Sequence, residues 1–148
     1  MKHFFLTLTL LILTLLPASA IKKFEANPIN IAAVMVEKTD SAQITSTCEY
    51  YGFTYQGVED GYTVLKRSNN SEIKFTFNDN GTTQKYPIIE VTTREAHKEI
   101  DTRLKELGFE KKGNIYEIKR NQFSRYIIQC NLVHNNTLTF RRFKKSHK

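Results

Sequence analysis

Cysteine and histidine are scarce in this chain, with two and four residues among 148. Neither cysteine has another close to it in sequence, and no two histidines have the i, i+4 spacing of a helical metal site. There is no glycine-rich phosphate loop and no serine in a nucleophile-elbow pattern. A thiol enzyme could only pair Cys130 with His134, but Cys130 alternates with apolar residues typical of a buried strand face. We therefore expect no enzyme, no metal site and no cofactor.

Long apolar runs are also missing after the first twenty residues, so no membrane-spanning helix is expected in the mature chain. At the N-terminus, Lys2 precedes an apolar run over Phe4–Leu16, and the small residues of Pro17–Ala20 follow. This order is typical of a cleavable secretory signal, because a run of about 13 residues is shorter than the roughly 20 that a spanning helix needs. We predict a signal peptide over residues 1–20, a mature chain from Ile21, and a secreted or periplasmic location.

Acidic residues are few in the C-terminal part of the chain. Residues 21–93 carry seven Lys and Arg against nine Asp and Glu, whereas residues 94–148 carry fourteen against six. A net charge of −2 beside one of +8 predicts a basic end or face. Its partner would be an acidic protein or an anionic component of a cell envelope. Nucleic acid is not expected, because an exported protein rarely meets it.

The two cysteines, Cys48 and Cys130, are 82 positions apart. In an oxidising compartment they form a candidate disulfide. Both also fall on apolar faces of their predicted elements, where a cysteine is often a small buried hydrophobic residue. The sequence leaves both interpretations open, because a disulfide needs a close approach of the two Cα atoms.

The few glycines reveal an internal repeat. Gly52-Phe53 recurs 56 residues later as Gly108-Phe109, and Leu65-Lys66-Arg67 recurs 53 residues later as Ile118-Lys119-Arg120. In that second register, Ile73, Phe75 and Phe77 correspond to Tyr126, Ile128 and Cys130. These matches predict two repeats, followed by a short basic tail from Arg141.

Each repeat is predicted to contain one helix and four strands. The helices are indicated by apolar residues at helical spacing, namely Ile44, Cys48 and Tyr51, then Ile100, Leu104 and Leu107. Asp40 is expected to cap the first helix, a Thr92–Glu95 capping box the second, and Gly52 and Gly108 to end them. The predicted strands cover residues 53–56, 61–67, 72–78, 86–92, 109–112, 115–120, 126–133 and 137–143. One further strand, Ile29–Val36, is predicted before the first helix.

The predicted fold class is α+β: two tandem repeats of a helix plus a four-stranded meander, about 29–92 and 93–143, share one antiparallel sheet with the helices on one face. Residues 21–148 would form a single domain, because one unit of roughly 50 residues buries too little surface alone. This architecture resembles the tandem helix-plus-meander arrangement of the beta-lactamase-inhibitor proteins and of some bacterial envelope assembly proteins. The resemblance lies in the order of the elements, so no site residue is carried over from it.

The sheet face left uncovered by the helices is the predicted binding surface. Its candidate residues are Tyr62, Lys74, Gln129, Arg141 and Arg142, which combine aromatic, polar and basic side chains. We predict an exported, non-catalytic protein that binds a macromolecular partner through this face and the basic C-terminal half. The alternative is a small-ligand or lipid carrier of the cell envelope, with its ligand between helices and sheet. The many large apolar residues expected in the core disfavour that alternative.

Overall fold

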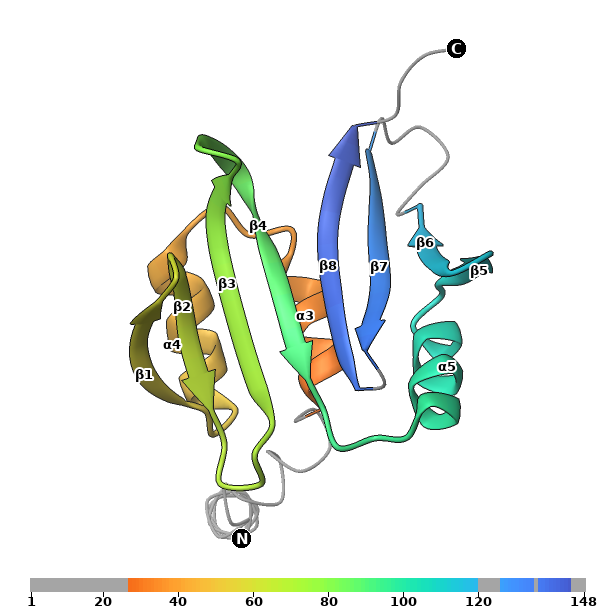
Figure 1. Ribbon diagram of the computed structural model, residues 1–148, viewed down its shortest axis with the longest axis horizontal. Helices are drawn as coiled ribbons and strands as arrows, with labels where there is room; N and C mark the ends of the chain where they lie inside the picture. The colour runs from red at the N-terminus through yellow and green to blue at the C-terminus, as the bar shows by residue number, and fades with distance from the viewer. Residues whose placement is uncertain (1–26, 120–125, 135, 145–148) are drawn as a thin grey trace, which may run out of the picture.

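The computed structural model describes residues 27–119, 126–134 and 136–144, and these form three helices and eight strands. In chain order they are α3 (Pro28–Met35), α4 (Ser41–Tyr50), β1 (Thr54–Glu59), β2 (Tyr62–Lys66), β3 (Glu72–Asp79), β4 (Thr82–Thr92), α5 (His97–Glu106), β5 (Glu110–Lys112), β6 (Ile115–Ile118), β7 (Tyr126–His134) and β8 (Thr137–Lys144) (Figure 1). The predicted signal peptide, the mature start at Ile21 and the last four residues of the predicted tail lie outside the described residues.

The eight strands form one antiparallel sheet in the order β1-β2-β3-β4-β8-β7-β6-β5. The predicted α+β fold with a single antiparallel sheet is confirmed. Strands β1–β4 form one meander and β5–β8 another, and the two meet where β4 pairs with β8. The buried residues Ile89 and Phe140 are direct partners at this junction. Each meander therefore starts at an outer edge of the sheet and ends at its centre, β1 to β4 from one edge and β5 to β8 from the other.

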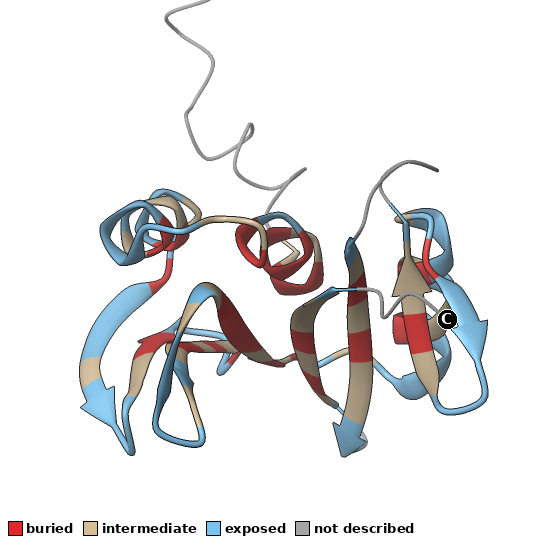
Figure 2. Cartoon of the chain, turned by 90° about the horizontal axis from the view of Figure 1, so that it is seen from above, coloured by how far each residue is buried: buried red, intermediate tan, exposed pale blue. Residues whose placement is uncertain are grey.

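One side of the sheet packs against the helices. In Figure 1, α3 and α4 lie behind the strands, and α5 lies beside β5 and β6. Buried residues from all three described helices and from alternate positions of the strands form one hydrophobic cluster, which includes Ile29, Ala32, Ile44, Cys48, Ile100, Leu104, Ile73, Phe75, Ile89, Ile128, Cys130 and Phe140. Seen from above, these buried residues concentrate between the helices and the sheet (Figure 2). Alternation along each strand leaves the other side of the sheet uncovered.

The helices α4 and α5 end in the same way. After α4, the N–H of Gly52 donates to Glu49 O (2.9 Å) and that of Phe53 donates to Cys48 O (3.0 Å). After α5, Gly108 and Phe109 donate to the matching carbonyls of Lys105 and Leu104, each at 2.9 Å. This pair of bonds is the Schellman motif, which needs a residue with positive φ after the helix. Both glycines supply it, with φ of 87° and 91°, and the predicted helix ends are confirmed.

The start of α4 is confirmed and the predicted start of α5 is wrong. Asp40 caps α4, because its Oδ1 accepts from the N–H of Ala42 at 2.9 Å. Thr92 instead ends β4, and α5 begins at His97 with the N–H of Ala96 donating to Glu99 Oε2 at 2.8 Å. Two glutamates, Glu95 and Glu99, each stand three residues after a possible first residue of the helix, Thr92 and Ala96. Because β4 extends to Thr92, the helix begins later and Glu99 makes the bond.

The predicted strand Ile29–Val36 is also wrong, because these residues belong to α3. Asn27 caps the helix by accepting from the N–H of Ile29 (2.9 Å), and Pro28 occupies its first position, where a missing N–H costs nothing. Almost every side chain of α3 is buried. In a short and mostly apolar run, the spacing of the apolar residues does not distinguish a buried helix from a buried strand.

The remaining predicted strands all overlap observed ones, but one correspondence that was predicted between the two meanders differs from the observed strand pairing by two residues. Leu65 pairs with Ile73 in the first meander, and Ile118 pairs with Ile128 in the second. The counterpart of Ile73 is therefore Ile128, and not Tyr126. The connection between β6 and β7 is two residues longer than that between β2 and β3, which shifts the register.

Candidate binding surfaces

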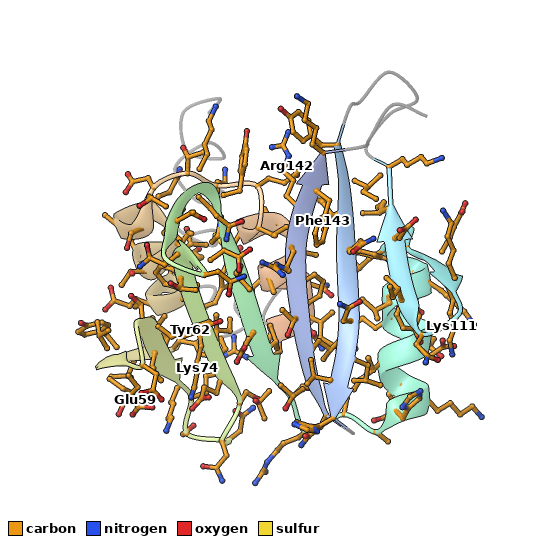
Figure 3. All side chains as sticks on the ribbon, turned by 45° about the horizontal axis from the view of Figure 1, so that its top comes forward. Glu59, Tyr62, Lys74, Lys111, Arg142 and Phe143 are labelled. Atoms are coloured by element: carbon orange, nitrogen blue, oxygen red, sulfur yellow. The ribbon has the colours of Figure 1, made fainter. Side chains whose placement is uncertain are left out.

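We call the side of the sheet that faces away from the helices the open face. The strand registers place on it Tyr62, Val64, Lys74, Thr76, Ile88, Glu90, Glu117, Ile127, Gln129, Asn131, Thr139, Arg141 and Phe143. Four of the five predicted binding residues, Tyr62, Lys74, Gln129 and Arg141, lie on this face. Figure 3 labels Tyr62, Lys74 and Phe143 on the strands that carry it.

The charges at the β1–β3 end of the open face are paired with one another. Lys74 Nζ lies 3.4 Å from Glu72 and 3.7 Å from Glu59, and Lys66 Nζ lies 3.1 Å from Glu72. Burial opposes the charged form of Lys74, but the charge and hydrogen bond of Glu72, with the charges of Glu59 and Glu90, outweigh it and raise its pKa. Lys74 is therefore a fixed cation whose charge is already balanced by this chain.

Tyr62 and Arg141 belong to a second group near the middle of the open face. Arg141 forms an ion pair with Asp79, and its guanidinium lies 5.5 Å from the centre of the Phe143 ring. Burial raises the pKa of Tyr62, and the charge of Glu90 raises it further while Arg141 opposes the rise. These neighbours hold the Tyr62 hydroxyl in its neutral form, as a hydrogen-bond donor on a half-buried ring.

Gln129 lies on the open face at its β5–β7 end, where it pairs with Glu117 of β6. Its Nε2 donates to Glu117 Oε1 at 2.8 Å, and Lys112 Nζ donates to Glu117 Oε2 at 2.7 Å. The hydrogen bond from Lys112, followed by that from Gln129, lowers the pKa of Glu117. The amide of Gln129 is thus held in one orientation.

An uncovered apolar pair completes the open face. Ile127 and Phe143 are direct cross-strand partners on β7 and β8, both are half-buried, and no described helix lies over them. Val133, on the same strand as Ile127, is 53% exposed. The predicted binding residues did not include Phe143, which lay within the predicted basic tail from Arg141.

Arg142 does not lie on the open face, contrary to expectation. Consecutive strand residues point to opposite sides, and both arginines are part of β8 rather than a tail, so Arg142 points to the helix side. Its guanidinium carbon lies 3.9 Å from the ring centre of Tyr86 and 4.2 Å from that of Tyr126. Two rings therefore enclose one guanidinium, an arrangement that we call the Arg142 clamp.

A bulge in β4 presents Tyr86 to the clamp. Thr76 pairs with Ile88, but Asn78 pairs with Thr83, so β4 has three more residues than β3 over this stretch. Bulges of this kind redirect side chains. Sequence reasoning could have found Tyr126, which lies diagonally across the β7–β8 hairpin from Arg142. It could not have found Tyr86, because that contact depends on the bulge and on how the two meanders meet.

Both cysteines are buried and unbridged in the structure. Burial raises the pKa of the Cys48 thiol to about 12, with Arg67 opposing the rise, and burial also raises that of Cys130. His134 is exposed four positions beyond Cys130, about 13 Å along an extended strand. The structure does not bring the thiol and the imidazole together. Within the described ranges, no group of three or more His, Cys, Asp or Glu residues could hold a metal ion.

A groove of about 390 Å³ lies on the helix side of the molecule. It is lined by Asn30, Ile31, Val34, Met35, Thr47, Tyr51 and Leu107. The groove runs between helices rather than between helices and sheet, where the carrier hypothesis placed a ligand. Asn30 Oδ1 is buried and has no hydrogen-bond partner in the described chain. None of the described helices has the length and apolar character needed to cross a membrane.

Comparison of the chain with protein-family models, with curated proteins and with solved structures finds no match. The likeness to the beta-lactamase-inhibitor proteins and to envelope assembly proteins therefore stays a likeness of predicted architecture.

Proposed function

We propose that this chain is an exported, non-catalytic binding protein, secreted or periplasmic, that recognises a macromolecular partner through the open face and the basic C-terminal half. The observation that carries the proposal is the uncovered Ile127–Phe143 pair, flanked by the ordered side chains of Arg141 and Gln129. An apolar centre with a polar rim is the usual composition of a protein–protein interface. Since the side chains of this rim are already held by ion pairs and hydrogen bonds, binding would cost little side-chain entropy.

The residue inventory supports a role without catalysis. A reactive cysteine needs a depressed pKa and access to solvent, whereas burial raises the pKa of both thiols here. The exposed His97 and His134 lie at the ends of different elements, α5 and β7.

We further propose that the sheet consists of two tandem copies of one helix-plus-meander unit. The palindromic strand order, the matching ends of α4 and α5, and the burial of Ile73 and its counterpart Ile128 support this. The helix α3 has no counterpart in the second copy and fills the space against β3 and β4.

The experiment is affinity capture of partners from the exporting cells with matched baits. Phe143→Ser removes the apolar centre of the open face, and Val34→Glu alters the groove on the opposite side, at a residue that is 50% exposed. Thermal unfolding of both variants checks that they are folded. The proposal expects a partner that is retained by wild type and Val34→Glu but lost by Phe143→Ser. A partner that is retained by Phe143→Ser would contradict it.

The second candidate function is the carrier of a small apolar ligand, favoured by the apolar lining of the groove and the unpartnered Asn30 Oδ1. Extraction of the purified protein with organic solvent, followed by mass spectrometry, tests it. A stoichiometric apolar ligand that is absent from Val34→Glu would support the carrier function over the open-face proposal.

A further inference from the structure

The Arg142 clamp contains a cation without an anion. Of the half-buried cations on the described strands, Lys74 and Arg141 hold carboxylates of this chain. Arg142 is half-buried as well, but no hydrogen bond or ion pair joins its guanidinium to another residue of the described chain. Because the ring centres of Tyr86 and Tyr126 lie 3.9 and 4.2 Å from its central carbon, the rings fit against its flat faces, and its in-plane N–H donors have no acceptor among the described residues.

The neighbouring sequence offers Arg142 no acidic side chain. Residues 118–148 contain eight Lys and Arg and no Asp or Glu side chain. The β4 bulge that carries Tyr86 has no acidic residue either, and its Gln84 has a buried Nε2 without an acceptor among the described residues. Two lysines add positive charge at the same end of the sheet: Lys85 precedes Tyr86 in sequence, and Lys144 is the cross-strand partner of Tyr126.

We propose that the Arg142 clamp binds a carboxylate of an acidic polypeptide segment in the partner. A planar guanidinium that is held on both faces presents its N–H fork edge-on, and this matches the two coplanar oxygens of a carboxylate. Stacking also fixes the group before binding, so little freedom remains to be lost. This inference rests on the proposed function, which requires a partner, and it specifies which group of that partner is bound.

A polyanion is the less suitable ligand. Binding of polyphosphate or an acidic glycan depends on many unpaired cations along one surface. Among the described residues, only Lys85 and Lys144 add charge beside the clamp, while Lys66, Lys74, Lys112 and Arg141 on the open face are already neutralised by carboxylates of the same chain. A single well-oriented guanidinium fits one carboxylate at a defined position.

The test uses the full mature chain and a short fluorescent peptide rich in glutamate, with a glutamine-rich peptide of equal length as the neutral control. Wild type should bind the glutamate peptide more tightly than the glutamine peptide. Arg142→Lys keeps the charge but loses the fork, and should weaken binding by about tenfold or more. Arg94→Lys, at an exposed arginine before α5, is the matched control and should bind as wild type does.

Tyr126→Ala tests the clamp itself. It leaves Arg142 in place but opens one face of the guanidinium, and should weaken binding of the glutamate peptide by about twofold to fivefold. Thermal unfolding checks that each variant is folded. If Arg142→Lys does not fold, Tyr126→Ala, whose ring is 37% exposed, decides the question.

Three outcomes overturn the inference: equal binding of the two peptides, unchanged binding by both Arg142→Lys and Tyr126→Ala, or displacement of the glutamate peptide by polyphosphate at far lower concentration. The last result would assign the site to a polyanion. Failure of the open-face proposal gives a different result. In that case Phe143→Ser still captures the partner, whether or not the glutamate peptide binds the wild-type protein.

Discussion

The N-terminal half of the sheet (α4 and β1–β4) and the C-terminal half (α5 and β5–β8) end their helices with the same hydrogen bonds but differ at their edges. The edge strand β1 has six residues, and its Tyr55 and Val58 are 49% and 63% exposed. The opposite edge strand β5 has three residues, Glu110–Lys112, and is charged throughout. Short, lysine-bearing strands protect a sheet edge from pairing with other chains, so the C-terminal edge is the better protected one.

The two halves also differ in how they treat charge. In the N-terminal half, Lys66 and Lys74 share Glu72, so cations and anions balance locally. In the C-terminal half the acidic residues are confined to α5 and the β5–β6 hairpin, and none follows Glu117. The two halves thus present surfaces of different charge, and the half with unbalanced charge supplies Arg142 and Tyr126 of the clamp, while Tyr86 comes from β4. The side chains on the sheet, and not the fold itself, determine what each half can bind.

The largest expected effect tests what the halves share. Phe53 and Phe109 each follow the helix-ending glycine and are each 3% exposed. Replacing either by Ala should lower the free energy of unfolding by about 3–5 kcal/mol, because a large cavity is left in one continuous core. Urea unfolding of both variants measures this, with Val58→Thr, at a 63% exposed residue of β1, as the control expected within about 0.5 kcal/mol of wild type. A loss below about 1 kcal/mol for one Phe but not the other would break the equivalence of the halves.

The next prediction concerns a position at which the halves differ. Cys48 of α4 takes the place that Leu104 takes in α5, and burial raises the pKa of the thiol from 9.0 to about 12. The folded state therefore keeps a proton that the unfolded chain loses above pH 9. The stability from this group is complete below pH 9 and is lost as the pH rises toward 12, by at most about 1.4 kcal/mol per pH unit.

Chemical unfolding between pH 8 and 12, compared for wild type and Cys48→Ala, measures that contribution by difference. The difference is needed because Tyr116, whose pKa burial and its hydrogen bond to Asp101 raise to about 12, titrates in the same range. The variant should start less stable at pH 8 and lose less on alkaline titration. Parallel curves for the two proteins would show that Cys48 is not shielded from solvent.

Local signals in the sequence were sufficient for most of the fold. Alternating strands such as Glu72–Asp79 and the glycines after α4 and α5 carry their own information, because strand alternation and C-caps depend on near neighbours. The helix α3 could not be recognised, since the spacing of apolar residues in this mostly apolar run does not separate a helix from a strand, and its position against β3 and β4 lies outside the run itself. The two-residue shift between β3 and β7 also escaped, because it depends on the length of a connection.

The sequence predicts the candidate sites less completely than it predicts the fold. Strand parity correctly grouped Tyr62, Lys74 and Gln129, because the alternation of side chains is a local property. The same rule separates Arg141 from Arg142, because both residues belong to β8 and point to opposite sides of the sheet. The contact between Arg142 and Tyr86 joins two meanders through a bulge, and no pattern within either strand contains it.

The smallest expected effect sharpens the comparison at the two helix ends. An alanine at Gly52 or Gly108 must adopt positive φ, which costs about 1–2 kcal/mol. A Cβ at Gly108 would also lie 3.3 Å from Ile118 Cδ1, whereas a Cβ at Gly52 would have nothing within 4 Å. Gly108→Ala should therefore destabilise more than Gly52→Ala, by a few tenths of a kcal/mol up to about 1 kcal/mol, depending on how far Ile118 moves.

Two further variants separate the strain from the contact. Asparagine tolerates positive φ better than alanine does, so Gly52→Asn should be less costly than Gly52→Ala. Ile118→Val shortens the side chain that meets the new Cβ, so Gly108→Ala should cost less in that background, as a double-mutant cycle by urea unfolding would show. Equal costs for Gly52→Ala and Gly108→Ala, with no coupling to Ile118, would mean that α5 does not meet β6 as it does in this structure. The similarity of the two helix ends would then extend to their surroundings, and the halves would differ in their edge strands and their charge but not at these helix ends.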